Sequence, residues 1–202
     1  TEETVRLISA IKEEPEWMLK ARLDAFHTFN SMKNPKWGID LSEIDFNNIK
    51  YYAYAGEKGQ TWEDVPKDIK DTFEKLGLPE TEQKYLAGLT TQYESEAIYH
   101  NLKSQWQDMG IIFEDTDTAL KKYPEYFKEY FGKLVPYTDN KYAALNTAVW
   151  SGGTFIYVPK GVKLWMPVQT YFRINMERMG QFERTLIIAD DDSQIHYIEG
   201  CT

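Results

Sequence analysis

TYFRINMERMGQFERTLIIADDDSQIHYIEGCT, residues 170–202, carries the strongest strand pattern in the chain. Within it, apolar and polar residues alternate over residues 170–175, 181–188 and 195–200. A glycine and an acidic turn sequence separate these runs, as is typical between strands. Because successive side chains of a strand point to opposite faces, this alternation predicts a β-rich unit at this end of the chain.

The strand pattern starts ahead of this stretch. Gly152 and Gly153 mark a turn, after which β-branched and aromatic residues predict strands over residues 154–158, 162–166 and 168–175. Tight turns join these short strands at a spacing that fits the coils of a β-helix. A jelly-roll sandwich gives a similar pattern, so periodicity alone leaves both architectures open.

The chain before these strands follows helical periodicity instead. Apolar residues recur every three or four positions over residues 5–11 and 18–32, and Pro15 suits the first position of the second helix. Asn34-Pro35 ends that pattern, because the residue before a proline avoids the helical conformation. Further helices are predicted over residues 64–77, 80–89, 94–109, 117–131 with a break at Pro124, and 141–147.

An irregular connection is predicted over residues 37–60, with a turn bracketed by Gly56 and Gly59. We place a domain boundary after this helical part. It separates a mainly α-helical region over residues 1–146 from the start of a β core over residues 147–202. The sequence therefore predicts an α+β fold.

Composition limits which cellular compartment and which class of binding partner are expected. The formal net charge is −9, from 23 basic and 32 acidic residues, which argues against nucleic acid or an anionic membrane as the natural partner. A single cysteine excludes an internal disulfide framework and fits a reducing cytosol. The sequence has neither a signal-peptide pattern over residues 1–13 nor an apolar run long enough to span a membrane. We therefore expect a cytoplasmic protein.

Cys201, the single cysteine, is the first candidate functional residue. Gly200 leaves room beside its sulfur, so that another protein can approach the thiol closely. Glu199 counts against a reactive thiolate, because a nearby carboxylate disfavours the charged form of the thiol. A cysteine at a strand end is also commonly a small buried apolar residue, and the residues alone favour that interpretation.

Arg173 and Asn175 are the second candidates. Alternation puts both on one face of their strand and Phe172 and Ile174 on the other. Polar residues on one strand face usually point into water. If the strand belongs to a closed coil, an interior Arg-Asn pair needs buried partners and becomes a functional candidate, with Arg173 the candidate cation for Cys201.

Three other polar patterns have simpler explanations. His196 has no second histidine at metal-ligand spacing, and the His-x-His pair of a cupin-type metal site is absent. The acidic residues 190–192 lack the spacing of a calcium loop and predict a solvated turn. Ser151-Gly152-Gly153 lacks both the spacing and the lysine of a phosphate-binding loop.

Five motifs, in this order along the chain, together resemble the SufB family, the B-type scaffold subunits of the Suf iron–sulfur cluster assembly machinery. These motifs are PEWMLKARL at residues 15–23, YVPKGV at 157–162, QTYFRIN at 169–175, GQFERTLII at 180–188 and HYIEGCT at 196–202. The resemblance runs along essentially the whole chain.

The resemblance implies a helical N-terminal region followed by the first coils of a right-handed parallel β-helix. It implies a scaffold rather than an enzyme, which works with a paralogous D-type subunit and an ABC-type ATPase. A cysteine desulfurase and its sulfur shuttle protein are the implied sulfur donors. By the same resemblance, Cys201 receives sulfur, and Arg173 and Asn175 pass it along the β-helix interior.

The chain departs from the family in length, because members of the family are more than twice as long. We therefore expect a fragment that does not assemble a cluster by itself. The iron–sulfur cluster, formed transiently, and a reduced flavin are expected only in the full-length complex. Two alternatives stay open: a structural D-type-like β-helix subunit with an inert, buried Cys201, and a cupin-like metalloenzyme, which the missing histidine pair disfavours.

Overall fold

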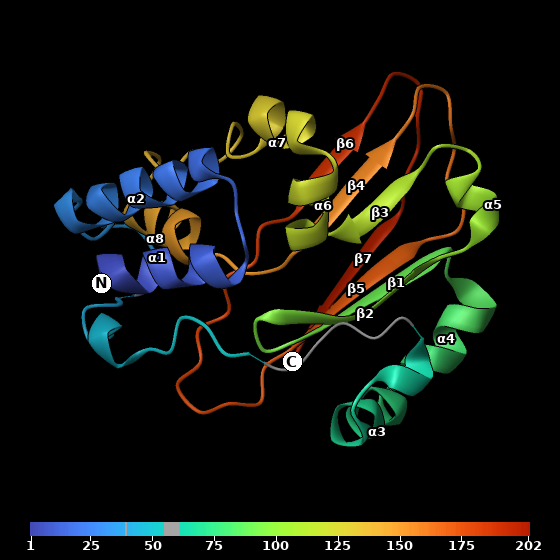
Figure 1. Ribbon diagram of the computed structural model, residues 1–202, viewed down its shortest axis with the longest axis horizontal. Coiled ribbons are helices and arrows are strands. Elements are labelled where there is room, and N and C mark those ends of the chain that lie inside the picture. The colour runs from blue at the N-terminus through green and yellow to red at the C-terminus, as the bar shows by residue number, and fades with distance from the viewer. Residues whose placement is uncertain (39, 55–60) are drawn as a thin grey trace.

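The computed structural model describes residues 1–38, 40–54 and 61–202, and in this part of the chain helices surround two sheets (Figure 1). One sheet has the strand order β2-β1-β5-β7 and the other β3-β4-β6. The strands are β1 (Gly88–Tyr93), β2 (Glu96–Leu102), β3 (Ile112–Asp115), β4 (Thr154–Val158), β5 (Val168–Arg173), β6 (Leu186–Ala189) and β7 (Tyr197–Cys201). The α-helices are α1 (Glu2–Ile11), α2 (Glu16–Ser31), α3 (Lys67–Lys75), α4 (Leu78–Tyr85), α5 (Ser104–Gln107), α6 (Thr116–Lys122), α7 (Pro124–Tyr130) and α8 (Lys141–Val149).

The last four strands follow a regular path. Going along the chain, β4 lies in one sheet and β5 in the other, after which β6 returns parallel to β4 and β7 parallel to β5. Between them, a parallel bridge joins Lys163 to Gln194. Each of β6 and β7 is therefore stacked on the strand two places earlier in the chain.

Three strands come from the region predicted to be mainly helical. β1 and β2 form an antiparallel hairpin, β1 also pairs in parallel with β5, and β3 pairs antiparallel with β4. The helix predicted over residues 94–109 is wrong, because these residues form β2 and the short helix α5. The helix predicted over residues 80–89 ends at Tyr85, ahead of β1. Pairing with β5, far along the chain, overrides the local helical pattern here.

Two predicted strands are shorter than expected. Residues 162–166 contain one bridge rather than a strand, and in the 181–188 run only Leu186 and its successors join a sheet. Ahead of β6, the backbone bonds to the glycine turn instead: Ser151 N donates to the Phe182 carbonyl at 2.7 Å. The strands predicted over residues 154–158 and 168–175 are confirmed, the second as far as Arg173.

The predicted helices before residue 78 and after residue 116 are confirmed by α1, α2, α3, α6, α7 and α8, including the break at Pro124. The turn expected at Gly56 and Gly59 lies outside the described residues. Helices and mixed sheets occur together, as the predicted α+β class requires. Strands from both sides of residue 146 share each sheet, and the division into two domains stays a prediction.

Each helical group covers a different part of the sheets (Figure 1). Helices α1, α2 and α8 pack together at one side of the molecule. Helices α6 and α7 cover the outer face of β4 and β6, where Phe127 and Trp150 are fully buried around Phe155. No helix in the described ranges is both long enough and apolar enough to cross a membrane.

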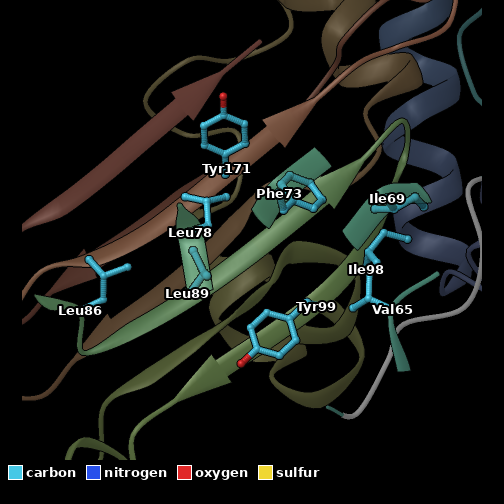
Figure 2. Close-up of a cluster of buried hydrophobic side chains, with 9 residues drawn as sticks. All are labelled: Val65, Ile69, Phe73, Leu78, Leu86, Leu89, Ile98, Tyr99 and Tyr171. Carbon is cyan, nitrogen blue, oxygen red and sulfur yellow. The ribbon is translucent and has the colours of Figure 1, made fainter. Parts of the chain in front are cut away.

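Helices α3 and α4 cover the outer face of the other sheet. Figure 2 shows side chains from both helices gathered over β1, β2 and β5. Phe73 is fully buried there, with its ring centroid 6.0 Å from that of Tyr171. Between the two sheets, Phe113, Ile156 and Val168 belong to a separate buried cluster. This inner cluster fills the space toward which the other faces of β5 and β7 point.

Candidate functional site

Cys201 is the last residue of β7, which is an edge strand of its sheet. It pairs with Phe172 of β5, and its side chain is exposed. The pairing continues one residue further, because Thr202 N donates to the Phe172 carbonyl at 3.1 Å and Ile174 N donates to the Thr202 carbonyl at 3.0 Å. The thiol is therefore held on ordered backbone.

Burial and two carboxylates act on this thiol. Partial burial, together with the charges of Glu183 and Glu199, raises the pKa of Cys201 above its usual value. The sequence predicts that Glu199 disfavours the thiolate of Cys201. In the structure the charge of Glu199 does raise the pKa of the thiol, and the charge of Glu183 raises it as well. Burial also raises the pKa of Glu183, which accepts a short hydrogen bond from the Gln181 side chain. The neutral thiol is therefore the favoured form of Cys201 near neutral pH.

A chain of hydroxyl groups runs inward from Glu199. The Tyr197 hydroxyl donates to Glu199 Oε2 at 2.7 Å and lies 3.1 Å from Thr154 Oγ1, which in turn lies 2.7 Å from Thr170 Oγ1. Thr154 and Thr170 are fully buried. Since Tyr197, Glu199 and Cys201 alternate with their neighbours along β7, all three share the inner face of the sheet. The inner face of β7 therefore carries polar groups that lead from Glu199 into the buried region.

Arg173 and Asn175 lie together, as predicted, but on the opposite face of the sheet from Cys201. Arg173 Nη2 is 3.4 Å from Asn175 Oδ1, and Arg173 Nη1 donates to Thr202 Oγ1 at 2.9 Å. Because Phe172 and Cys201 are paired, alternation turns the Arg173 side chain to the opposite face from the sulfur. Among the described residues, no hydrogen bond or ion pair joins Arg173 to Cys201. The structure therefore brings together two of the three predicted site residues and separates the third.

Glu94, which the sequence does not single out, supports the Arg-Asn pair. It lies in the β1–β2 turn with a left-handed backbone (φ 53°) and is 7% exposed. Its Oε1 accepts a hydrogen bond from Asn175 N at 3.0 Å, and its own N–H donates to the Arg173 carbonyl at 2.9 Å. Sequence reasoning misses it because the local pattern places it in a helix, and no local signal links it to residues 173–175.

In the part of the chain that the structure describes, the histidines and the acidic turn are not grouped as metal ligands. His196 is exposed, and His100 lies 2.9 Å from Thr90 Oγ1 and 3.7 Å from Glu114. In the described ranges, no group of three or more His, Cys, Asp or Glu side chains is arranged to hold a metal ion. Asp191 pairs with Lys160 at 3.1 Å in an exposed turn. The sequence has one cysteine, Cys201, whereas an iron–sulfur cluster is held by several cysteine thiolates.

The sequence comparisons agree with the motifs. Residues 6–170 match the family model described as the SufBD protein N-terminal region. A curated iron-sulfur cluster assembly SufBD family protein of Staphylococcus haemolyticus is 61% identical over 203 residues. Counterparts with the same description from Staphylococcus saprophyticus and from Staphylococcus aureus strain MRSA252 are each 59% identical over 203 residues.

Each of these matches covers 100% of this chain and 44% of the relative. The chain thus spans less than half the length of the curated relatives that it matches. The match of the family model covers most of the chain. The chain therefore belongs to the SufBD family of iron-sulfur cluster assembly proteins.

Proposed function

We propose that this chain is the N-terminal part of a B-type scaffold subunit that accepts sulfur at Cys201 for iron–sulfur cluster assembly. The observation that carries the proposal is the position of Cys201 at the end of β7, on backbone paired with β5, in a chain of this family. The motif HYIEGCT, which carries part of the resemblance to B-type subunits, contains this cysteine.

The transfer needs no oxidant or reductant. The thiolate of Cys201 attacks the outer sulfur of a donor persulfide, R–S–SH. As the new S–S bond forms, the donor S–S bond breaks, the donor leaves as a thiolate, and the transferred sulfur keeps its proton. Since the neutral thiol of Cys201 is favoured, loss of its proton is a required step before attack.

The sulfur then moves through the interior of a right-handed parallel β-helix. The stacking of β6 on β4 and of β7 on β5 supports this architecture, because consecutive coils of a β-helix pair in parallel in this way. Since Arg173 and Asn175 lie on the face opposite Cys201, we assign them to a step outside this interior rather than to activation of Cys201. The contacts of Arg173 with Asn175 and with Thr202 support a shared role at the end of the strand.

The partners follow from the same proposal. A cysteine desulfurase and its shuttle protein deliver the sulfur, and a D-type subunit and an ABC-type ATPase complete the cytoplasmic complex. The iron–sulfur cluster is the cargo of the full-length complex. The reduced flavin implied by the resemblance stays a proposal for that complex and has no residues assigned on this chain.

A structural D-type-like subunit is the second candidate. The raised pKa of Cys201 and the position of Arg173 on the opposite face favour it, because neither activates the thiol. The two candidates differ in what Cys201→Ser does to the full-length protein, in complex with its D-type and ATPase partners. A sulfur-accepting scaffold loses cluster formation, measured by visible absorbance, and keeps both partners on gel filtration. Unchanged cluster formation in this variant overturns the proposal in favour of the structural subunit.

A further inference from the structure

A hollow of about 370 Å³ lies between helices α2 and α7. Its walls are aromatic and apolar, with Trp17 from α2 and Phe131 after α7 among them. The charged residues that line it are Lys128 and Lys133. The chain as a whole carries an excess of acidic residues, so a hollow lined by two lysines and no carboxylate is unusual in this molecule.

A second hollow, of about 360 Å³, continues on the other side of Phe131 and reaches β6. Phe131 lines both hollows, and α7 with the following loop lies between α2 and β6 (Figure 1). Leu134 and Val135 line the second hollow and are 96% and 55% exposed. We call this continuous surface the α7 groove, defined by Trp17, Lys128, Phe131, Lys133, Leu134 and Arg184.

Arg184 supplies a third cation to the α7 groove, and its bonds are all to neutral groups. It donates to Thr147 Oγ1 at 2.8 Å and to the Val135 carbonyl at 3.3 Å, and its guanidinium lies 5.0 Å from the centre of the Phe131 ring. Among the described residues, no ion pair involves Lys128, Lys133 or Arg184. Burial lowers the pKa of Arg184, as expected for a cation without a nearby carboxylate.

We propose that the α7 groove binds an acidic segment of another protein, with apolar side chains of that segment against Phe131, Leu134 and Trp17. Carboxylates of the segment pair with Lys128, Lys133 and Arg184. Apolar groups alone do not determine the occupant, but the three cations around them select negative charge. Glu183 also lines the groove and accepts a bond from Gln181, so the groove does not suit a polyanion such as nucleic acid as well as it suits a few carboxylates.

This site lies away from Cys201, although Glu183 both lines the groove and acts on the thiol. The groove is built from α2, α7, the loop after it and the start of β6, whereas Cys201 ends β7 in the other sheet. The inference therefore does not depend on whether Cys201 accepts sulfur, and the two proposals fail in different experiments.

The test measures the binding of labelled synthetic peptides to a full-length protein that carries this sequence, by fluorescence anisotropy. The probe is an amphipathic peptide of Leu and Glu, and the controls are peptides of the same length with Gln or Lys in place of every Glu. We expect the Glu peptide to bind about tenfold more tightly than either control. Its affinity should fall as salt rises, because exposed charges are screened.

Two substitutions locate the peptide on the protein. The double variant Lys128→Glu/Lys133→Glu should weaken binding of the Glu peptide about tenfold, and Leu134→Ser should weaken it as well. The matched control is Lys67→Glu/Lys163→Glu, which reverses two lysines outside the groove and should leave the affinity unchanged.

Three outcomes overturn the proposal. The first is equal binding of the Glu and Lys peptides, and the second is equal weakening by the control variant. The third is no binding of the Glu peptide to the unsubstituted protein, which means that the chain's own further residues or another ligand cover the groove. Sedimentation with phosphatidylserine vesicles tests a membrane surface as the alternative. If the protein binds these vesicles but not the Glu peptide, and Lys128→Glu/Lys133→Glu abolishes the vesicle binding, the groove binds a membrane surface instead.

Discussion

Cys201 and Arg173 point to opposite faces of the sheet that β5 and β7 form, because Cys201 pairs with Phe172 rather than with Arg173. The guanidinium expected to activate the thiol contacts Thr202 and Asn175 instead. The charges that act on the thiol are the carboxylates of Glu183 and Glu199. Burial and these two carboxylates therefore raise the pKa of Cys201, and Arg173 does not contact the thiol.

Replacing Glu199 with glutamine should lower the pKa of Cys201. The folded protein holds this pKa above its usual value through burial and two carboxylates, so removing one negative charge favours the thiolate. The rate of iodoacetamide alkylation, followed against pH, should rise at a lower pH in Glu199→Gln and in Glu183→Gln. Glu177→Gln, an exposed residue that does not act on the thiol, is the matched control. An unchanged alkylation profile in both variants contradicts the electrostatic account.

Replacing Arg22 with methionine should destabilise the protein by about 3–5 kcal/mol, because it leaves a buried carboxylate without its partner. Arg22 is completely buried, pairs with Glu14 at 2.6 Å and lies 4.5 Å from the centre of the Trp150 ring. Arg6 pairs with Glu2 at 2.7 Å, but both side chains are largely exposed, so Arg6→Ala should cost at most about 1 kcal/mol. Urea denaturation of the two variants, followed by tryptophan fluorescence, gives both values. Equal losses contradict the prediction.

Alanine at Gly153 should be far more costly than alanine at Gly161, although both glycines have positive φ. At Gly153 (φ +108°) an added Cβ lies 2.3 Å from the Arg184 carbonyl oxygen, which is backbone and cannot move aside. At Gly161 (φ +73°) an added Cβ has no atom within 4 Å. We expect about 1–2 kcal/mol for Gly161→Ala, from its backbone conformation alone, and about 3 kcal/mol or more for Gly153→Ala. Thermal unfolding of both variants checks the order, and a reversed order refutes the clash expected at Gly153.

As the pH rises, the Lys12 ion pairs should lose their stabilising effect only in strong alkali. Lys12 is buried and pairs with Asp117 at 2.8 Å and Glu96 at 3.1 Å. Burial alone lowers the pKa of Lys12, but the two carboxylates outweigh it and hold the folded-state pKa above 10.5. A raised lysine pKa gives stability that is full below the unfolded-state pKa and is lost as pH rises through the folded-state pKa.

Lys12→Met isolates this contribution. At neutral pH the variant should be less stable than the unsubstituted protein by about 3–5 kcal/mol, since two carboxylates lose their partner. The difference between the two proteins should stay constant to about pH 10 and shrink above it. If the difference in stability between the two proteins shrinks only on acidification and not above pH 10, the pH dependence comes from the carboxylates rather than from Lys12.

Local sequence pattern is sufficient to predict a helix or strand when the residues that it packs against are close in the chain. The strand over residues 154–158 and the helix break at Pro124 follow from alternation and from proline geometry. The strands β1 and β2 cannot be predicted in this way. β1 pairs with β5, whose residues come about eighty positions later, so a short stretch of sequence around β1 does not include its partner. The β1–β2 turn has a left-handed Glu94 rather than a glycine, which removes the usual turn signal.

The candidate site is predictable to a similar extent. Cys201, Arg173 and Asn175 come from their residue types and from the resemblance, and the contact between Arg173 and Asn175 follows from alternation. The opposite orientation of Cys201 is not predictable, because it depends on which residue of β5 pairs with it. The role of Glu94 is hidden for the same reason, since it meets Asn175 only through the fold.

The most direct measurement is the mass of the peptide that contains Cys201, after the full-length protein is incubated with cysteine desulfurase, shuttle protein and cysteine. A sulfur-accepting scaffold gives this peptide with the mass of one added sulfur atom, removed by dithiothreitol and absent in Cys201→Ser. The contrary result is an unmodified Cys201 peptide while the shuttle protein itself carries sulfur. That result makes Cys201 an inert residue of a structural subunit.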